Sequence, residues 1–222
     1  ALYDGSAWKV LTFTELSLAL GTLSNNTNYD VFVYDNSGSV AIDTLVAWTD
    51  GTTRVTALTL QDGVLVKSGA TTRRYVGTIR TTSTTTTEDS KAKRFVWNMY
   101  NRVLRVMRVV ESTNSWSYST AAWRQANNST ANQLAMVRGI DEDAVSVQAV
   151  GSAVSSTSTP RSVRTAIGLD SASSPATNCI IYPGSSSDSI QGNPASFLTR
   201  SPGVGYHYLA WLEYGGGADT QT

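Results

Sequence analysis

The sequence predicts an all-β protein with antiparallel strands. Thr, Ser, Val and aromatic residues recur along all 222 residues, and β-branched and aromatic side chains favour strands. Short turn sequences interrupt these runs, among them DNSG, QDG, KSG, YPGSSS and SPGVG. Frequent turns that contain Gly, Pro, Asn and Asp are typical of antiparallel folds. The length fits one large β-sandwich, or a small module plus a sandwich.

The first elements are marked by specific turn residues. Residues 29–34 have the aromatic and β-branched content of a strand, and Asp35-Asn36-Ser37-Gly38 follows as a turn. Asp62-Gly63 separates two apolar runs, 58–60 and 64–66. A tight hairpin needs a positive φ that glycine adopts without a Cβ clash, so we expect a hairpin at this point.

Residues 71–80 are predicted to form a third strand. Strict alternation would place Tyr75, Gly77 and Ile79 on one face, with Arg74, Val76 and Thr78 on the other. The stretch TTSTTTT at 81–87 has nothing to bury. We therefore predict an N-terminal β module at residues 1–80, a linker at 81–90 and a larger module at 91–222.

The next segment has an ambiguous period. FVWNMY at 95–100 places apolar residues at both strand and helix spacings, and its aromatic content favours a strand over a single helical turn. Arg102, Arg105 and Arg108 then recur every third residue, which fits neither a regular strand nor a helix. A bulged strand with one face against another subunit is one solution.

Further strands are predicted at 116–123, 134–138, 145–154, 163–169 and 206–212. The last has large apolar groups on both faces, because Tyr206, Tyr208, Ala210 and Leu212 alternate with His207, Leu209, Trp211 and Glu213. This pattern indicates a central strand. Residues 152–202 are rich in small polar residues, and we expect long surface loops there that carry binding specificity.

Charge and cysteine content limit the partners. Seventeen basic and seventeen acidic side chains cancel, so no long-range field favours nucleic acid or an anionic membrane. The lone Cys179 forms no disulfide within the chain. No apolar run reaches the roughly 20 residues of a membrane span, and the start, ALYDGSAWKV, lacks signal-peptide features. We expect a soluble protein without membrane insertion.

The sequence offers few residues for catalysis, and we expect no enzyme, cofactor or metal. One histidine and one cysteine make no zinc-ligand set. His207 lies in an alternating strand without a GxSxG motif, which favours a hydrogen-bonded core or interface histidine over a triad member. The cluster Asp141-Glu142-Asp143 could serve glycoside hydrolysis or hold calcium. A solvated turn explains these carboxylates equally well.

The aromatic residues give a stronger functional hypothesis. Flat aromatic faces stack on sugar rings, while nearby amides and guanidinium groups fix the hydroxyls. SWSYSTAAWRQANN has this composition. Its candidate ligand-binding residues are Trp116, Tyr118, Trp123, Arg124, Gln125, Asn127 and Asn128. The alternative is structural, since Trp116 and Tyr118 could share one buried strand face.

Several motifs resemble a module of tail fibres and other fibre-type virion proteins of tailed bacteriophages. They span nearly the whole chain in order: LYDGSAWK, YDVFVYDNSG, LVAWTDGTTR, LQDGVLVKSGATTRRYVGTIRTT, KRFVWNMYNRV, WRQANN and GYHYLAWLEYG. The resemblance implies a homotrimeric all-β appendage at the virion surface. It also implies that 91–222 is an antiparallel, jelly-roll-like β-sandwich that contacts the host, preceded by a smaller mounting module.

The resulting expectation is a tail fibre or receptor-binding protein that attaches to a host cell-surface glycan. It would be made in the bacterial cytoplasm and be incorporated into the virion beside other virion proteins. Two alternatives stay open, a capsid-bound head fibre or decoration protein, and a polysaccharide-degrading tail enzyme. The glycine-rich end and the lack of an initiator methionine indicate a piece of a longer fibre.

Overall fold

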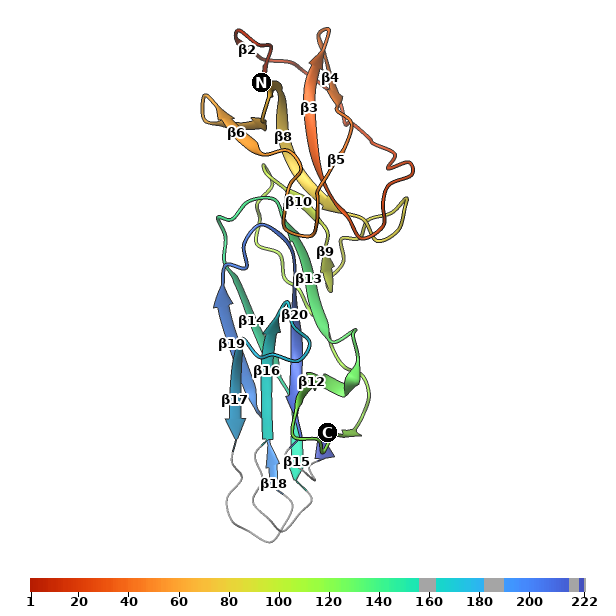
Figure 1. The fold of residues 1–222 in the computed structure, drawn as a ribbon, viewed down its shortest axis with the longest axis vertical. Helices are drawn as coiled ribbons and strands as arrows, with labels where there is room; N and C mark the ends of the chain where they lie inside the picture. Colours follow the sequence, from red (N-terminus) through yellow and green to blue (C-terminus); the bar gives the residue numbers. More distant parts are fainter. Residues whose placement is uncertain (156–162, 182–189, 216–219, 222) are drawn as a thin grey trace. The chain divides into compact units, whose positions relative to one another are not determined.

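The computed structural model describes residues 1–155, 163–181, 190–215 and 220–221. These residues form an all-β fold with antiparallel sheets (Figure 1), which confirms the predicted fold class. Two compact units interleave along the chain. The first contains Ala1–Val106, Met136–Asp141 and Gly203–Tyr206, and the second contains Met107–Ala135, Glu142–Pro202 and His207–Thr222. No described segment is a helix long and apolar enough to cross a membrane.

The first unit is built on a seven-stranded sheet. Five strands follow the order β4-β3-β8-β7-β6, while β5 pairs with β3 and β10 with β8. Their bounds are β3 Asn28–Asn36, β4 Ser39–Ile42, β5 Val46–Ala47, β6 Leu58–Gln61, β7 Val64–Lys67, β8 Ala70–Arg80 and β10 Val96–Asn98. A small hairpin, β1 Leu2–Tyr3 with β2 Trp8–Lys9, and the short β9 Lys93–Arg94 also belong to this unit.

Both predicted turns of the first unit are confirmed. Between β6 and β7, Asp62 has φ 49° and Gly63 has φ 81°, the left-handed conformation that a two-residue hairpin turn requires. Between β3 and β4, Ser37 and Gly38 are also left-handed, at 56° and 93°. The Gly38 amide donates to Asp35 Oδ1 at 2.6 Å, which fixes that turn.

The predicted alternation along β8 is wrong for Thr78. Tyr75 pairs with Phe32, whereas Gly77 pairs with the preceding residue, Val31, so that Val76 is an extra residue in β8. This bulge brings Tyr75 and Thr78 to the same side, and their hydroxyl groups are 2.5 Å apart. Residue types alone do not indicate such a bulge, because it depends on the partner strand.

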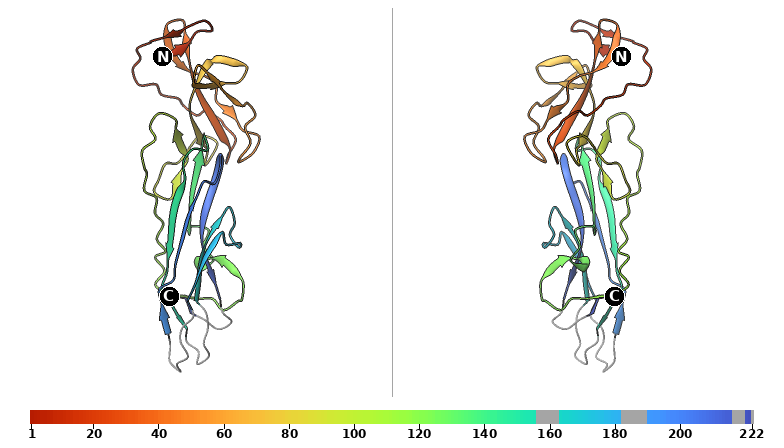
Figure 2. Two further views of the ribbon diagram at one scale, coloured as in Figure 1. Left: turned by 90° about the vertical axis from the view of Figure 1, so that its left-hand side faces the viewer. Right: turned by 90° about the vertical axis from the view of Figure 1, so that its right-hand side faces the viewer.

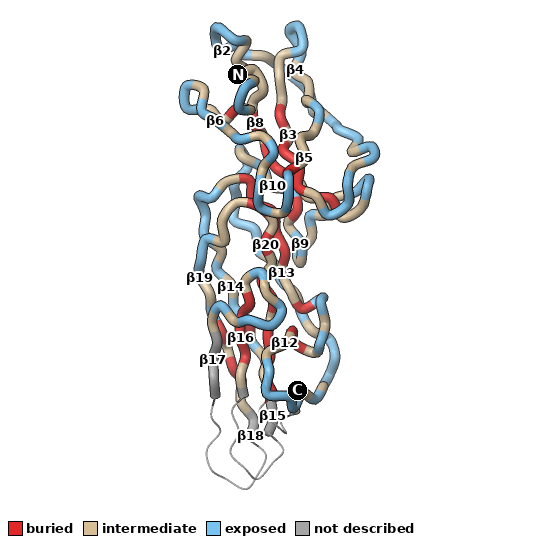
Figure 3. Tube along the Cα trace, viewed as in Figure 1, coloured by how far each residue is buried: buried red, intermediate tan, exposed pale blue. Residues whose placement is uncertain are grey.

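The core of the first unit lies along β3, β7 and β8. Phe32, Val66 and Tyr75 are fully buried, and Figure 3 shows the buried residues concentrated on β3 and β8. The Trp97 ring stacks on Tyr75 with centroids 6.1 Å apart. Gly139 packs directly against both rings, because a Cβ atom there would collide with the Tyr75 hydroxyl and the Trp97 ring.

Replacing Gly139 with alanine should therefore destabilise the protein by about 1 to 3 kcal/mol or more, as expected for overpacking of a filled core. Urea unfolding measures this loss. Gly51→Ala is the matched control, since its added Cβ would meet its nearest neighbour, Tyr206 Cβ, at an ordinary 3.9 Å. An equal effect of both substitutions would contradict the packing described for Gly139.

The second unit contains two packed layers. One sheet includes the strand order β17-β16-β20-β13, with β12 also pairing with β20. Figure 2 shows β16 and β20 side by side. The antiparallel pair of β14 and β19 supplies the other layer, because β19 contacts β16 and β17. The bounds are β12 Trp123–Gln125, β13 Gln133–Arg138, β14 Val145–Val150, β16 Val163–Leu169, β17 Thr177–Ile181, β19 Ala195–Arg200 and β20 Gly205–Tyr214.

A further sheet of the second unit has the order β11-β21-β15-β18. Its strands are β11 Trp116–Ser117, β15 Ala153–Ser155, β18 Ile190–Gly192 and β21 Thr220–Gln221. The central position predicted for 206–212 is confirmed, since β20 lies between β16 and β13. Ala166, Ala210 and Leu212 form a buried cluster where β16 meets β20.

Four sequence-based expectations need correction or comment. Residues 95–100 contain β10, as preferred, but 101–113 form no strand, so the bulged strand predicted for the arginine-spaced segment is wrong. The strand predicted at 116–123 is two separate strands, β11 and β12. Residues 152–202 contain β15 to β19 rather than only long loops, and 156–162 and 182–189 lie outside the described residues. The segment predicted as a linker, 81–90, lies within the first unit, where Thr81 and Thr87 form a β-bridge.

Candidate functional site around Glu213

Glu213 on β20 is the one acidic residue among the buried residues described in the second unit. Only 2% of this residue is exposed. Its Oε2 accepts a hydrogen bond from Trp116 Nε1 at 2.6 Å. Its Oε1 accepts from Arg124 Nε at 2.8 Å and from the Asn127 main-chain amide at 3.1 Å. Three donors from segments 86 to 97 residues earlier in the chain therefore converge on one carboxylate.

Burial and hydrogen bonding act in opposite directions on this group. Burial raises the pKa of Glu213, whereas the hydrogen bonds from Trp116 and Arg124 and the positive charge of Arg124 lower it; burial is the larger effect. A buried carboxylate is tolerated when it is paired and its lone pairs are satisfied. Arg124 supplies the pairing, and the Trp116 and Asn127 N–H groups supply the remaining donors.

Arg124 makes a second contact, with an aromatic ring. Its guanidinium carbon lies 3.7 Å from the centroid of the Tyr118 ring, a cation–π geometry. The Tyr118 hydroxyl donates to the Ala122 carbonyl at 2.9 Å, which fixes the ring. Within the described part of the chain Arg124 donates only through Nε, although the side chain is 28% exposed. The two terminal NH2 groups of Arg124 therefore have no protein acceptor among these residues.

The asparagines follow β12 in a short 3-10 turn, η1 Ala126–Asn128. Asn127 and Asn128 both have positive φ, 53° and 50°, which asparagine tolerates better than most residues. Asn127 Nδ2 donates to Thr113 Oγ1 at 3.0 Å. The exposed Asn128 side chain makes no hydrogen bond within the described residues.

The structure brings together four of the seven predicted site residues. Trp116, Arg124 and Asn127 bind Glu213, and Tyr118 joins them through Arg124. The other three have separate surroundings: the Trp123 ring packs edge-on against Tyr214, Gln125 is buried and donates to Gln133 Oε1 at 3.2 Å, and Asn128 is exposed.

Sequence reasoning missed Glu213 and Trp211 as parts of this cluster. Trp211 packs edge-on against Trp116, with ring centroids 6.1 Å apart. A signal was present, because Glu213 is the one carboxylate on a strand with large apolar groups on both faces. A carboxylate at such a position needs donors from elsewhere in the chain.

A second carboxylate, that of Glu111, is linked by hydrogen bonds to the segment that contains η1. Glu111 accepts from the Thr113 amide at 2.8 Å through Oε1, and from Asn132 Nδ2 at 2.7 Å through Oε2. These hydrogen bonds, with that of Thr113 the largest cause, lower the pKa of Glu111 from 4.5 to about 2. Asn132 is buried and also donates to the Ala126 carbonyl at 2.9 Å, so that it ties Glu111 to η1.

This arrangement predicts an acid-sensitive contribution of Glu111 to stability. Because its pKa is lower in the folded state, its contribution is present above 4.5 and is lost as the pH falls toward about 2. Glu111→Gln should therefore show a smaller fall in melting temperature over this interval than the wild type. Glu15→Gln, at an exposed position, should behave like the wild type. Identical pH profiles for all three proteins would contradict the role given to Glu111.

The other catalytic candidates have ordinary structural surroundings. His207 is 5% exposed, and its Nδ1 lies 2.7 Å from Asp170 Oδ2, which confirms a hydrogen-bonded core histidine. Asp170 Oδ1 also accepts from the Tyr208 amide at 2.9 Å. In the cluster at 141–143 every residue is exposed, and Asp141 pairs with Arg138 at 3.5 Å. Among the described residues, no group of three His, Cys, Asp or Glu could hold a metal ion.

Comparisons with protein-family models, with curated proteins and with solved structures found no match.

Proposed function

We propose that the protein is a tail fibre or receptor-binding component of a bacteriophage virion, and that it attaches to a glycan on the host cell surface. The sequence motifs support the class of protein, and the antiparallel all-β fold is compatible with it. The observation that carries the binding role is Arg124, whose guanidinium carbon lies 3.7 Å from the Tyr118 ring centroid and whose two terminal NH2 groups donate no hydrogen bond within the described residues.

The chemistry of this arrangement suits a sugar. A planar guanidinium presents paired N–H donors at a fixed spacing, and these match two neighbouring hydroxyls or a carboxylate of a saccharide. The bond from Nε to Glu213 and the contact with Tyr118 hold the guanidinium in place before a ligand arrives. Such preorganisation reduces the entropy lost on binding.

Binding of the purified chain to whole host cells and to extracted surface polysaccharide tests this proposal. We expect saturable binding by the wild type, and about a tenfold loss of affinity in Arg124→Lys. Lysine keeps the charge beside Glu213 but loses the planar pair of donors. If the purified chain shortened the polysaccharide, this would contradict a purely adhesive role and would indicate the enzymatic alternative.

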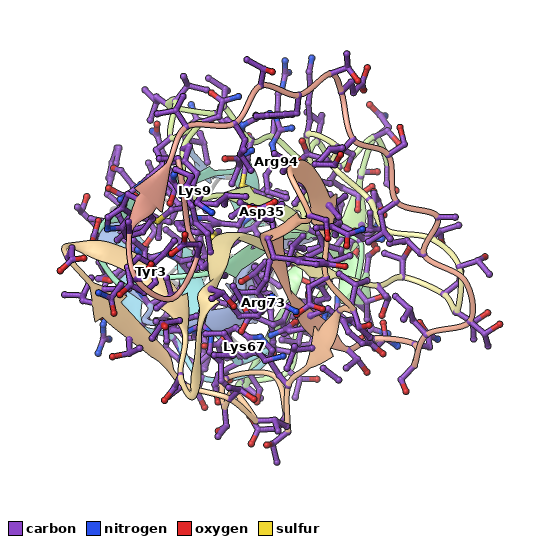
Figure 4. All side chains as sticks on the ribbon, turned by 90° about the horizontal axis from the view of Figure 1, so that it is seen from above. Tyr3, Lys9, Asp35, Lys67, Arg73 and Arg94 are labelled. Atoms are coloured by element: carbon purple, nitrogen blue, oxygen red, sulfur yellow. The ribbon has the colours of Figure 1, made fainter. Side chains whose placement is uncertain are left out.

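The first unit supplies a closely matched control. Arg73 also stacks on a tyrosine, with its guanidinium carbon 4.0 Å from the Tyr34 ring centroid, and pairs with Asp43 at 3.1 Å. Lys67 approaches the same carboxylate at 3.8 Å, and Figure 4 shows Lys67 and Arg73 close together. Arg73→Lys should leave binding unchanged. Absence of binding by the wild type would reject the function, and equal losses in both variants would reject the site.

A further inference from the structure

The strand β6 is one edge of the seven-stranded sheet in the first unit. It ends the strand order β4-β3-β8-β7-β6, so only its β7 side is paired. Figure 3 shows the β6 hairpin mostly in the colours of exposed and intermediate residues, and Leu60 is 64% exposed. An uncovered edge strand is a template for pairing with another chain, unless a proline, a charge or a bulge within it prevents this. The sequence of β6, LTLQ, contains no proline or charge, and its pairing with β7 has no bulge.

The main-chain groups of Leu58 and Leu60 point away from β7. Residues that flank a two-residue hairpin turn form a hydrogen-bonded pair, and non-hydrogen-bonded pairs then alternate with hydrogen-bonded ones. Gln61 and Val64 flank the turn, so Leu58 and Leu60 belong to non-hydrogen-bonded pairs. The Ala57 carbonyl agrees with this alternation, since it accepts a hydrogen bond at 2.9 Å from the residue after β7. Within the described residues, the amides and carbonyls of Leu58 and Leu60 therefore have no hydrogen-bond partner.

A mostly apolar groove of about 490 Å³ borders β6. Its lining includes Leu58 of β6, Leu65 of β7, and Ile140 and Val204 from two other segments of the same unit. Leu58 thus borders the groove and also has main-chain groups that point outward. Side chains directly opposite each other on paired antiparallel strands share one face and lie about 4.5 to 5.5 Å apart. A residue that pairs with Leu58 from an added strand therefore places its side chain at the groove.

The charges of the groove itself are compensated. Each charged residue that lines the groove or lies opposite Leu58 has a partner of the opposite sign in the first unit. These pairs are Arg54 with Asp30 at 2.7 Å, Asp141 with Arg138 at 3.5 Å, and Lys67 with Asp43 at 3.8 Å. The groove therefore favours uncharged, apolar side chains of a ligand.

Two carboxylates next to this surface lack a cationic partner. Asp62, in the turn after β6, accepts hydrogen bonds from two uncharged side chains, each at 3.0 Å. Asp50 accepts from the amides of Thr52 and Thr53, which line the groove, at 2.7 and 2.8 Å. Among the described residues neither carboxylate has an ion pair. A second copy of β6 does not supply the missing cation, since residues 55–63 contain no lysine or arginine.

We propose that β6 and the groove beside it bind an extended, basic segment of another protein, which adds as a further strand to the sheet. Apolar side chains at every second position of this segment enter the groove, and a basic residue at one end pairs with Asp62. Hydrogen bonds to the main chain of Leu58 and Leu60 supply affinity, whereas the groove and Asp62 select the sequence. The site lies in the first unit and does not depend on the glycan binding proposed for Arg124.

Titration of the full chain with a fluorescently labelled synthetic peptide, KVTVTVTK, tests the proposal by fluorescence anisotropy. We expect saturable binding of this peptide, and about threefold or weaker binding of EVTVTVTE, whose glutamates are repelled by Asp62. Asp62→Asn should bind the two peptides equally, because it removes the charge and keeps a residue that tolerates positive φ. Absence of saturable binding of KVTVTVTK at millimolar concentration would overturn the proposal, as would an unchanged preference in Asp62→Asn.

A proline at the outward position of β6 tests the strand pairing. Leu60→Pro should weaken binding of KVTVTVTK about tenfold, because proline removes the outward amide while an edge strand tolerates its ring. Val40→Pro is the matched control. Val40 lies on β4, the opposite edge of the sheet, and its pair with Asp35 is likewise the second from a two-residue turn. Equal losses in the two variants would contradict pairing at β6.

Amide hydrogen exchange followed by NMR locates the bound peptide on the wild type. The amides of Thr59 and Gln61 face β7 and should be protected with or without the peptide. Those of Leu58 and Leu60 should become protected only when KVTVTVTK is added. Bound peptide that leaves both amides unprotected would lie elsewhere. Protection that increases with protein concentration in the absence of peptide would assign the edge to a second copy, and either result would overturn the proposal.

Discussion

Arg54→Ala should lower the free energy of unfolding by about 3 to 5 kcal/mol, because it removes one partner of a buried ion pair. Arg54 Nε donates to Asp30 Oδ2 at 2.7 Å, and its guanidinium carbon lies 4.4 Å from the Trp48 ring centroid. It also donates to the Gly139 carbonyl. Asp30 is only 1% exposed, so that its carboxylate would stay buried with Thr78 as its remaining side-chain donor.

Equilibrium urea unfolding followed by tryptophan fluorescence measures this effect. Arg73→Ala is the matched control, since its pair with Asp43 is partly exposed, at 30% and 20%, and should contribute about 1 kcal/mol or less. The double variant Arg54→Ala/Asp30→Asn should lose less than the sum of the single losses, because it leaves no unpaired buried charge. Strict additivity would show that the two side chains do not act as a pair.

Glu213→Ala is expected to have the second largest effect, about 3 kcal/mol, because it leaves the Trp116 indole N–H and the Asn127 amide without an acceptor. It also leaves Arg124 without its carboxylate. Glu213→Gln should lose less, since one side-chain oxygen remains to accept. The same urea unfolding measurement gives both values.

The pH dependence of this loss has a defined sign. Burial raises the pKa of Glu213 above 4.5 in the folded state. Its contribution is therefore fully present below 4.5 and decreases as the pH rises through the folded pKa. The difference in stability between the wild type and Glu213→Ala should be larger in acid than at neutral pH. A difference that grows with rising pH would mean that pairing with Arg124, rather than burial, dominates.

The elements that sequence reasoning predicted well are those with local causes. The hairpin at Asp62-Gly63 follows from the conformational freedom of glycine, and β16 and β20 follow from apolar patterns that reflect burial. The bulge at Val76 and the division of 116–123 into β11 and β12 were missed, because both depend on partner strands distant in sequence.

The composition of one segment predicted four residues of the candidate site, but not how these residues are arranged around Glu213. Trp116, Tyr118, Arg124 and Asn127 were chosen because they lie close together in the sequence, yet they meet around Glu213, 86 residues beyond Asn127. A pattern within one segment contains no information about such a partner.

The most direct test of the proposed function is the position of this chain in intact virions, determined by cryo-electron microscopy at a resolution that traces side chains. The proposal predicts this fold in fibres of the tail, with Arg124 accessible to the host surface. Finding the chain on the capsid would contradict the role in attachment and favour a head fibre or decoration protein. A fully traced particle without this fold would contradict the virion assignment itself.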